Sequence, residues 1–209
     1  TKEMTISEEI IKRVSESYRR IRNTSKFLLS NINDFDVNGF DKSNLLVLDK
    51  WIIHKAEEMN KQIQKDYEEF RFNKIMKDVI NFCTLELGGY YLDIIKDRLY
   101  TSKSDGIPRC SAQMTCYILM RYINSWIAPI LTFTAEEIYL KIPNSKESIY
   151  LDDWFSYSVD IDEKSIELFD SLYNIKSDVS RLIEEARNSE VVGSSLECKI
   201  EMICNNKLY

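Results

Sequence analysis

Residues 7–32 read SEEIIKRVSESYRRIRNTSKFLLSNI, which is the pattern of one long amphipathic helix. Apolar and small residues recur at steps of three and four, so they fall on one face of an α-helix. We expect the hydroxyl oxygen of Ser7 to cap the start of this helix. The face predicted to be buried comprises Ile11, Val14, Tyr18, Ile21, Ser25, Leu28 and Ile32.

The same spacing continues outward over most of the chain. Only 5 Gly and 3 Pro interrupt it, which favours long helices. We predict further helices from about residue 43 to 70, from 72 to about 101, and over 108–129 with Pro108 at its first position. The glycine pair at 88–89 is expected either to weaken its helix, by about 1 kcal/mol per glycine relative to alanine, or to mark a close approach of two helices.

The C-terminal third carries three further patterns. Thr134 to Glu137 has the spacing of a capping box and predicts a short helix that Pro143 ends. A last helix is predicted over 164–188, with a buried face that comprises Phe169, Leu172, Val179, Leu182 and Ala186. Apolar residues then alternate with charged ones, which predicts one half-buried strand that contains Leu196, Cys198, Ile200 and Met202.

These patterns predict an all-α fold, a helical bundle followed by a short C-terminal strand. We expect the bundle to span residues 1–143. An acidic connector over 144–163 should pack on the bundle, and 164–209 should hold the last helix and the start of a junction region. The chain starts at Thr1 with neither an initiator Met nor an apolar leader, and we interpret it as an internal fragment of a longer protein.

Composition excludes several classes of function. The formal net charge is −6, so the chain is not a general polyanion binder. A single histidine, His54, excludes chemistry that needs two, and the chain has no glycine-rich nucleotide loop. No apolar run is long enough to span a membrane. We therefore predict no catalytic residue, no metal ligand and no cofactor in this chain.

The 5 cysteines contain no Cys-x-x-Cys pair. An odd number without close pairing favours a reducing compartment and buried thiols over a disulfide framework or a zinc site. We expect a cytoplasmic location. The cysteines are Cys83, Cys110, Cys116, Cys198 and Cys204.

The first helix also carries an unusual charge pattern. Basic residues fall along one flank of the helix, beside its apolar face, and guanidinium groups suit phosphate because their planar fork can donate two hydrogen bonds to one anion. From this geometry we predict phosphate contacts by Arg19, Arg22 and Lys26. A second basic group around Tyr100 adds Arg98 and Lys103 as candidates, and Tyr100 itself could stack on a base or pack in the core.

The same basic residues also have a structural interpretation that needs no RNA. A basic stripe is often a solvated face that pairs with acids elsewhere. Arg22 could bond to Asp93 or Asp97, and Glu137 could act as a helix cap with its neighbour Glu136.

Five blocks resemble the anticodon-binding domain of bacterial isoleucyl-tRNA synthetases, in the same order and over nearly the whole chain. The two most specific are the runs YRRIRNT and DIIKDRLYT. Two departures, GGY at 88–90 and Tyr139 where Trp is usual, concern local packing. The blocks are 18–24 with 27–29, 48–51, 91–101, 126–138 and 192–197.

The resemblance implies a fold of the class I aminoacyl-tRNA synthetase anticodon-binding type. It implies a domain that binds the anticodon stem-loop of tRNA(Ile) and positions it for a catalytic domain of the same chain, with no DNA or membrane partner. The longer enzyme would be an isoleucine–tRNA ligase that uses ATP with magnesium, and many bacterial members also hold zinc elsewhere. The alternative is a helical docking domain without direct RNA contact.

Overall fold

The computed structural model describes residues 6–201, which fall into two compact units. The first unit runs to Ile161 and the second begins at Asp162. In the first unit the long helices are α1 (Glu8–Ser30), α2 (Val47–Glu68) and α5 (Ile107–Ile127). The shorter ones are α3 (Phe72–Asn81), α4 (Leu92–Thr101) and α6 (Thr132–Tyr139).

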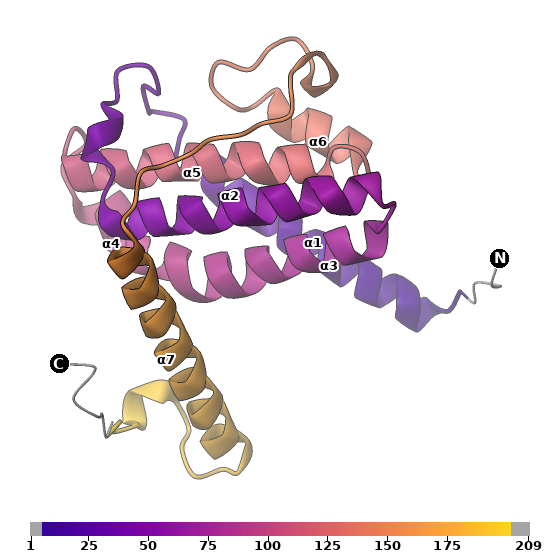
Figure 1. The fold of residues 1–209 in the computed structure, drawn as a ribbon. Coiled ribbons are helices and arrows are strands. Elements are labelled where there is room, and N and C mark those ends of the chain that lie inside the picture. Colours follow the sequence, from indigo (N-terminus) through magenta and orange to yellow (C-terminus); the bar gives the residue numbers. More distant parts are fainter. Residues whose placement is uncertain (1–5, 202–209) are drawn as a thin grey trace. The chain divides into compact units, whose positions relative to one another are not determined.

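Helix α5 forms the centre of this unit. Almost every side chain from Ser111 to Ile127 is buried, because α1, α2, α4 and α6 all pack on this helix. Figure 1 shows α2, α5 and the α3–α4 run side by side, with α1 crossing them. Helices over the described residues confirm the all-α prediction. Pro108 lies in the first turn of α5 and the Ser7 hydroxyl accepts the Ile10 N–H, as expected.

Only the second half of the predicted α1 face is buried. Ile21, Leu28 and Ile32 are fully covered, whereas Ile11 and Val14 are 58% and 64% exposed. The start of α1 extends beyond the other helices of its unit (Figure 1), so none of these described helices covers the two side chains. The burial predicted for Ile11 and Val14 is therefore wrong, since periodicity defines a face and not the neighbour that covers it.

The run predicted as one helix over 72–101 is continuous but changes its winding. A π-helical segment, Phe82–Tyr91, lies between α3 and α4. A Cβ atom on Gly88 would lie 3.1 Å from the Cys83 carbonyl oxygen, and one on Gly89 would lie 3.4 Å from that of Thr84. Both carbonyls belong to the same segment, five residues earlier. The predicted close approach of a second helix at the glycines is thus wrong, because the crowding comes from the π winding itself.

The capping box is also wrong. Helix α6 begins at Thr132, two residues before the predicted cap. The Thr134 hydroxyl lies 3.1 Å from the Tyr18 hydroxyl instead, and the Glu137 carboxylate bonds to Arg22. The two side chains that would form the capping box, Thr134 and Glu137, thus bond to residues of α1 and not to the backbone of α6.

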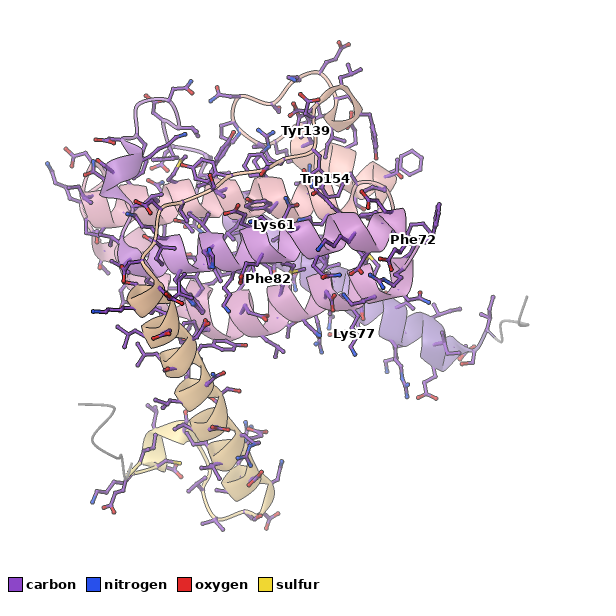
Figure 2. The ribbon with its side chains drawn as sticks, viewed as in Figure 1. Lys61, Phe72, Lys77, Phe82, Tyr139 and Trp154 are labelled. Atoms are coloured by element: carbon purple, nitrogen blue, oxygen red, sulfur yellow. The ribbon has the colours of Figure 1, made fainter. Side chains whose placement is uncertain are left out.

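After α6 the chain crosses the bundle in an extended conformation. Both polar atoms of the Asn60 amide, in α2, bond to this segment. Its Oδ1 accepts the Trp154 Nε1–H at 2.8 Å, and its Nδ2 donates to the Phe155 carbonyl at 3.3 Å. Tyr122 of α5 donates its hydroxyl to the Tyr157 carbonyl at 2.6 Å. Figure 2 shows Trp154 against the helices.

The second unit consists of α7 (Glu163–Asn188) and a short 3₁₀ turn, Ser195–Glu197, within its described residues. No side chain of α7 is fully buried. Leu172 and Leu182 are exposed, so the predicted burial is wrong for these two, whereas Phe169, Val179 and Ala186 are half-buried. The strand is wrong as well over residues 196–201, and Met202 lies outside the described residues. Leu196 is 95% exposed. The strand is not formed because a single strand has no neighbouring strand to pair with its backbone.

Candidate nucleic-acid interface

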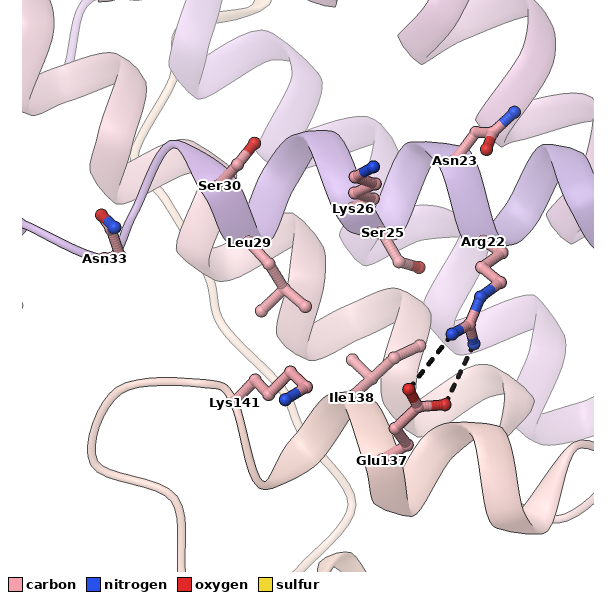
Figure 3. A pocket seen from close by; sticks show the side chains of 10 residues that line it. All are labelled: Arg22, Asn23, Ser25, Lys26, Leu29, Ser30, Asn33, Glu137, Ile138 and Lys141. Atoms are coloured by element: carbon pink, nitrogen blue, oxygen red, sulfur yellow. Dashed lines mark hydrogen bonds and ion pairs between the residues drawn. The ribbon is translucent and has the colours of Figure 1, made fainter.

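A groove with a volume of about 560 Å³ lies between α1 and α6. Figure 3 shows the side chains that line it, which come from the second half of α1, the last turn of α6 and the residues that follow these helices. Polar and charged groups form its rim, and Leu29 and Ile138 form part of its floor. The rim includes Arg22, Asn23, Lys26, Asn33, Glu137 and Lys141.

Arg22 and Glu137 close one end of this groove. The Arg22 guanidinium donates from Nη1 to Oε2 at 3.0 Å and from Nη2 to Oε1 at 3.1 Å, and both side chains are about half exposed. These hydrogen bonds, with the charge of Arg22, hold the pKa of Glu137 below its usual value. Asp93 and Asp97, the acids suggested as partners for Arg22, are not its partners in the structure.

Lys26 and Lys141 add two further cations to the groove, and the positive charge of Lys141 contributes to the lowered pKa of Glu137. Both side chains are exposed, and neither makes a hydrogen bond or ion pair with any residue that the structure describes. Lys26 lies one turn of α1 after Arg22. Lys141 follows α6 and is brought beside them by the packing of α6 near α1 (Figure 3). A free ammonium group at a groove rim is available to an incoming anion.

Arg19 lies one turn before Arg22 on the outer flank of α1. Its Nη2 donates to Glu16 Oε2 at 2.6 Å, and this hydrogen bond lowers the pKa of Glu16. Arg19 and Arg22 line a second, open hollow along α1. The structure thus brings Arg19, Arg22 and Lys26 together on one side of the helix.

The other two predicted site residues lie elsewhere. Arg98 is only 17% exposed on its side chain and bonds to both oxygens of the fully buried Asp49. Lys103 lies in the turn after α4 and pairs with Asp105, two residues later. Neither lines the groove between α1 and α6.

Sequence reasoning missed Lys141 and Asn33 and assigned Glu137 to a cap. No local signal marks Lys141, which lies between the end of α6 and Pro143. The groove exists only because residues separated by more than a hundred positions, such as Arg22 and Glu137, meet in the fold.

The thiols and acids show no metal-binding arrangement among the described residues. No group of three His, Cys, Asp or Glu side chains in residues 6–201 is placed to hold a metal ion. Cys83 and Cys116 are buried, and burial raises the pKa of the Cys83 thiol to about 12. Cys110 and Cys198 are half-buried free thiols, and Cys204 lies outside the described residues. No described helix is apolar over a length that would cross a bilayer.

Known proteins have sequences similar to this chain. The chain is 40% identical over 212 aligned residues to an isoleucine–tRNA ligase of Shewanella sediminis, and 41% identical over 214 to one of Coxiella burnetii. A third, from Methylococcus capsulatus, is 38% identical over 213. The alignments cover 99–100% of this chain but 23% of each relative, so the chain spans about a quarter of their length. Residues 49–202 match the family described as the anticodon-binding domain of tRNA ligase. The chain therefore belongs to the family of anticodon-binding domains of tRNA ligases.

Proposed function

We propose that the groove between α1 and α6 binds the sugar-phosphate backbone of the anticodon stem-loop of tRNA(Ile). In this proposal the chain is part of an isoleucine–tRNA ligase and acts in the cytoplasm. Membership of the anticodon-binding family supports binding to tRNA, and the names of the relatives support isoleucine. The observation that carries the choice of surface is the excess of positive charge in one groove, where Arg22, Lys26 and Lys141 face the single acid Glu137.

The chemistry of the groove suits a phosphate chain. Lys26 and Lys141 supply point charges, and Arg22 presents the outer side of a guanidinium fork that Glu137 holds in place. Arg19 extends the cationic flank toward the start of α1. The side chains of Asn23 and Asn33 add neutral hydrogen-bond donors. Such contacts fix the orientation of an RNA without reading its sequence.

The mechanism is positional. A tRNA held by its anticodon arm has its other end restricted in space, and restricting a reactant raises the rate of a reaction at a distant site. We assign the use of ATP with magnesium and the esterification of isoleucine to the catalytic domain of the longer ligase. Any zinc site is also assigned to that remainder, and neither enters the role of this chain. Arg98 is left out of the RNA-binding set because Asp49 occupies its donors.

The test is a salt titration of RNA binding. The probe is a labelled RNA hairpin with the anticodon stem-loop sequence of an isoleucine tRNA. Lys26→Glu with Lys141→Glu should weaken binding and reduce the slope of log affinity against log salt by about 0.7–0.9 for each phosphate that is no longer bound. Lys77→Glu with Lys61→Glu makes the same charge change on exposed lysines of α3 and α2 that do not line the groove, and should leave most of the slope in place.

An unchanged slope in the groove variant would reject this surface. If both variants also bound the hairpin as tightly as the original chain, the result would favour a docking domain without direct RNA contact.

A further inference from the structure

A second cavity lies next to the groove between α1 and α6. This second hollow, of about 390 Å³, adjoins the end of α1 and is also lined by Ser30 and Asn33, which line the groove as well. The shared residues show that the two cavities adjoin at the end of α1. The second hollow is formed by Ser30, Asn33, Asp34, Tyr100, Arg109 and Gln113, among others.

The charges in this second hollow are balanced, unlike those in the groove. Asp34 accepts hydrogen bonds from Arg109 Nη2 and Gln113 Nε2, both at 2.7 Å. Gln113 also donates to the Asn31 carbonyl at 2.9 Å and is almost completely buried, so this wall is fixed from below. A carboxylate in the wall repels phosphate but accepts hydrogen bonds from amino groups.

One donor in the wall has no partner. The Arg109 Nε is buried, and no residue that the structure describes accepts a hydrogen bond from it. Its guanidinium is otherwise held by Asp34, which fixes the plane of the fork. This buried N–H is out of reach of a ligand, but the Arg109 side chain as a whole is 21% exposed. The hollow therefore combines the exposed part of a fixed guanidinium with a carboxylate edge and the side-chain amide of Asn33.

Tyr100 gives this hollow an aromatic surface. It lies in the last turn of α4, and 64% of it is exposed although its neighbour Leu99 is buried. An aromatic face beside mixed donors and acceptors is the combination that an unstacked nucleobase requires, because bases stack on rings and are recognised at their edges. A phosphate would gain nothing from the ring.

We infer that the hollow at Tyr100 is a pocket for one unstacked base of the anticodon loop, with the RNA backbone following the groove. Tyr100 stacks on the base, and Arg109 and Asn33 bond to its edge. Asp34 accepts from an amino group of the base and holds Arg109. The inference rests on the proposed function, which supplies the RNA, and adds the position at which a base is contacted.

The test compares Tyr100→Ala with Tyr100→Phe in the 209-residue chain, using the same labelled hairpin. Loss of stacking on one base should weaken binding by about 5- to 150-fold in Tyr100→Ala. Tyr100→Phe keeps a ring and should restore most of the affinity. The salt slope should stay as in the original chain, because every phosphate remains bound. Phe70→Ala, at another exposed ring that does not line the hollow, should have no effect.

Hairpins with an abasic site at each loop position in turn identify the base. One abasic position should weaken binding to the original chain and cause no further loss with Tyr100→Ala. Equal binding by Tyr100→Ala and the original chain, or a Tyr100→Phe variant as weak as Tyr100→Ala, would overturn the base pocket. If the lysine variants still reduced the salt slope, the groove would stand without the pocket. If none of these variants changed binding, both proposals would fall.

Discussion

Arg98 bonds to both oxygens of Asp49, from Nη1 to Oδ2 at 2.9 Å and from Nη2 to Oδ1 at 2.7 Å. Asp49 is completely buried in α2 and also accepts hydrogen bonds from the hydroxyls of Tyr91 and Ser111. A single carboxylate thus joins α2, the π-helical segment, α4 and α5. Arg98 was a candidate for RNA contact because it belongs to a group of basic residues, but in the fold it is the counter-ion of a buried carboxylate.

Removal of this arginine should unfold the domain more readily. Arg98→Met leaves the Asp49 charge buried without its counter-ion, which should lower the free energy of unfolding by about 3–5 kcal/mol. Urea denaturation measures it. Arg98→Met combined with Asp49→Leu should recover much of the loss, since both charges are then gone. A stability of Arg98→Met equal to that of the original chain would show that Arg98 is not the counter-ion that Asp49 needs.

Neutralising Glu137 should strengthen RNA binding. The Glu137 carboxylate is ionised, lies at the rim of the groove and neutralises Arg22. Glu137→Gln keeps the shape, can still bond to Arg22 and removes the repulsion of phosphate, so we expect a few-fold tighter binding of the hairpin at low salt. Glu58→Gln, on an exposed acid of α2 outside the groove, is the matched control. Weaker binding by Glu137→Gln would mean that the ionised pair itself is required.

The glycine pair offers a test of the π-helical segment. At Gly89 an added Cβ would make an ordinary contact at 3.4 Å, so Gly89→Ala should stabilise the chain by about 0.5–1 kcal/mol through the lower entropy of the unfolded state. At Gly88 the Cβ would lie 3.1 Å from a backbone oxygen that must move, so Gly88→Ala should destabilise by about 1 kcal/mol or more. Thermal unfolding of the two variants side by side checks the prediction, and a gain from both alanines would contradict the π winding.

Stability should fall in acid because of Asp152. The Asp152 carboxylate bonds to Tyr139 at 2.7 Å, to Lys146 at 2.8 Å and to Arg121 at 2.9 Å. Burial opposes its ionisation, but the hydrogen bonds from Lys146 and Tyr139 and the positive charges prevail, so the pKa of Asp152 in the folded chain lies below its usual value.

The unfolded chain then binds a proton more readily than the folded one. The stability from Asp152 is complete above the ordinary pKa of aspartate, about 3.9, and is lost as the pH falls below that value. Melting temperatures measured from pH 6 to pH 3 should decline at the acid end, and Asp152→Asn should show a smaller decline. An identical pH profile in Asp152→Asn would rule out this origin.

Tyr139 shows how a departure from the family pattern fits the fold. Its hydroxyl donates to Asp152 and also accepts the backbone N–H of Lys146 at 3.1 Å. Tryptophan, the residue that the resemblance leads us to expect here, has an N–H donor but no acceptor, so it could not make both bonds. The side chain is otherwise buried, so its hydroxyl makes these two bonds at the edge of the core.

The positions of the helices follow from the sequence without any knowledge of the fold. Spacing of apolar residues predicted α1, α2 and α5 to within a few residues, and Ser7 and Pro108 marked two of their starts. These signals act within a few residues of the backbone, because capping bonds and helical periodicity are local. The glycine pair was noticed for the same reason, although the winding around it was not foreseen.

The packing of the helices decides which faces are covered and which charges are free. Val14 and Ile21 share one stripe of α1, yet only Ile21 has a neighbour. Arg22 and Arg98 both lie in basic runs, yet one lines a groove and the other is cross-linked to a buried acid. Lys141 joins Lys26 only because α6 packs near α1 (Figure 3). Periodicity fixes the direction of a side chain relative to its own helix, whereas burial and ion pairing depend on residues far away in the chain, which meet only when the helices pack.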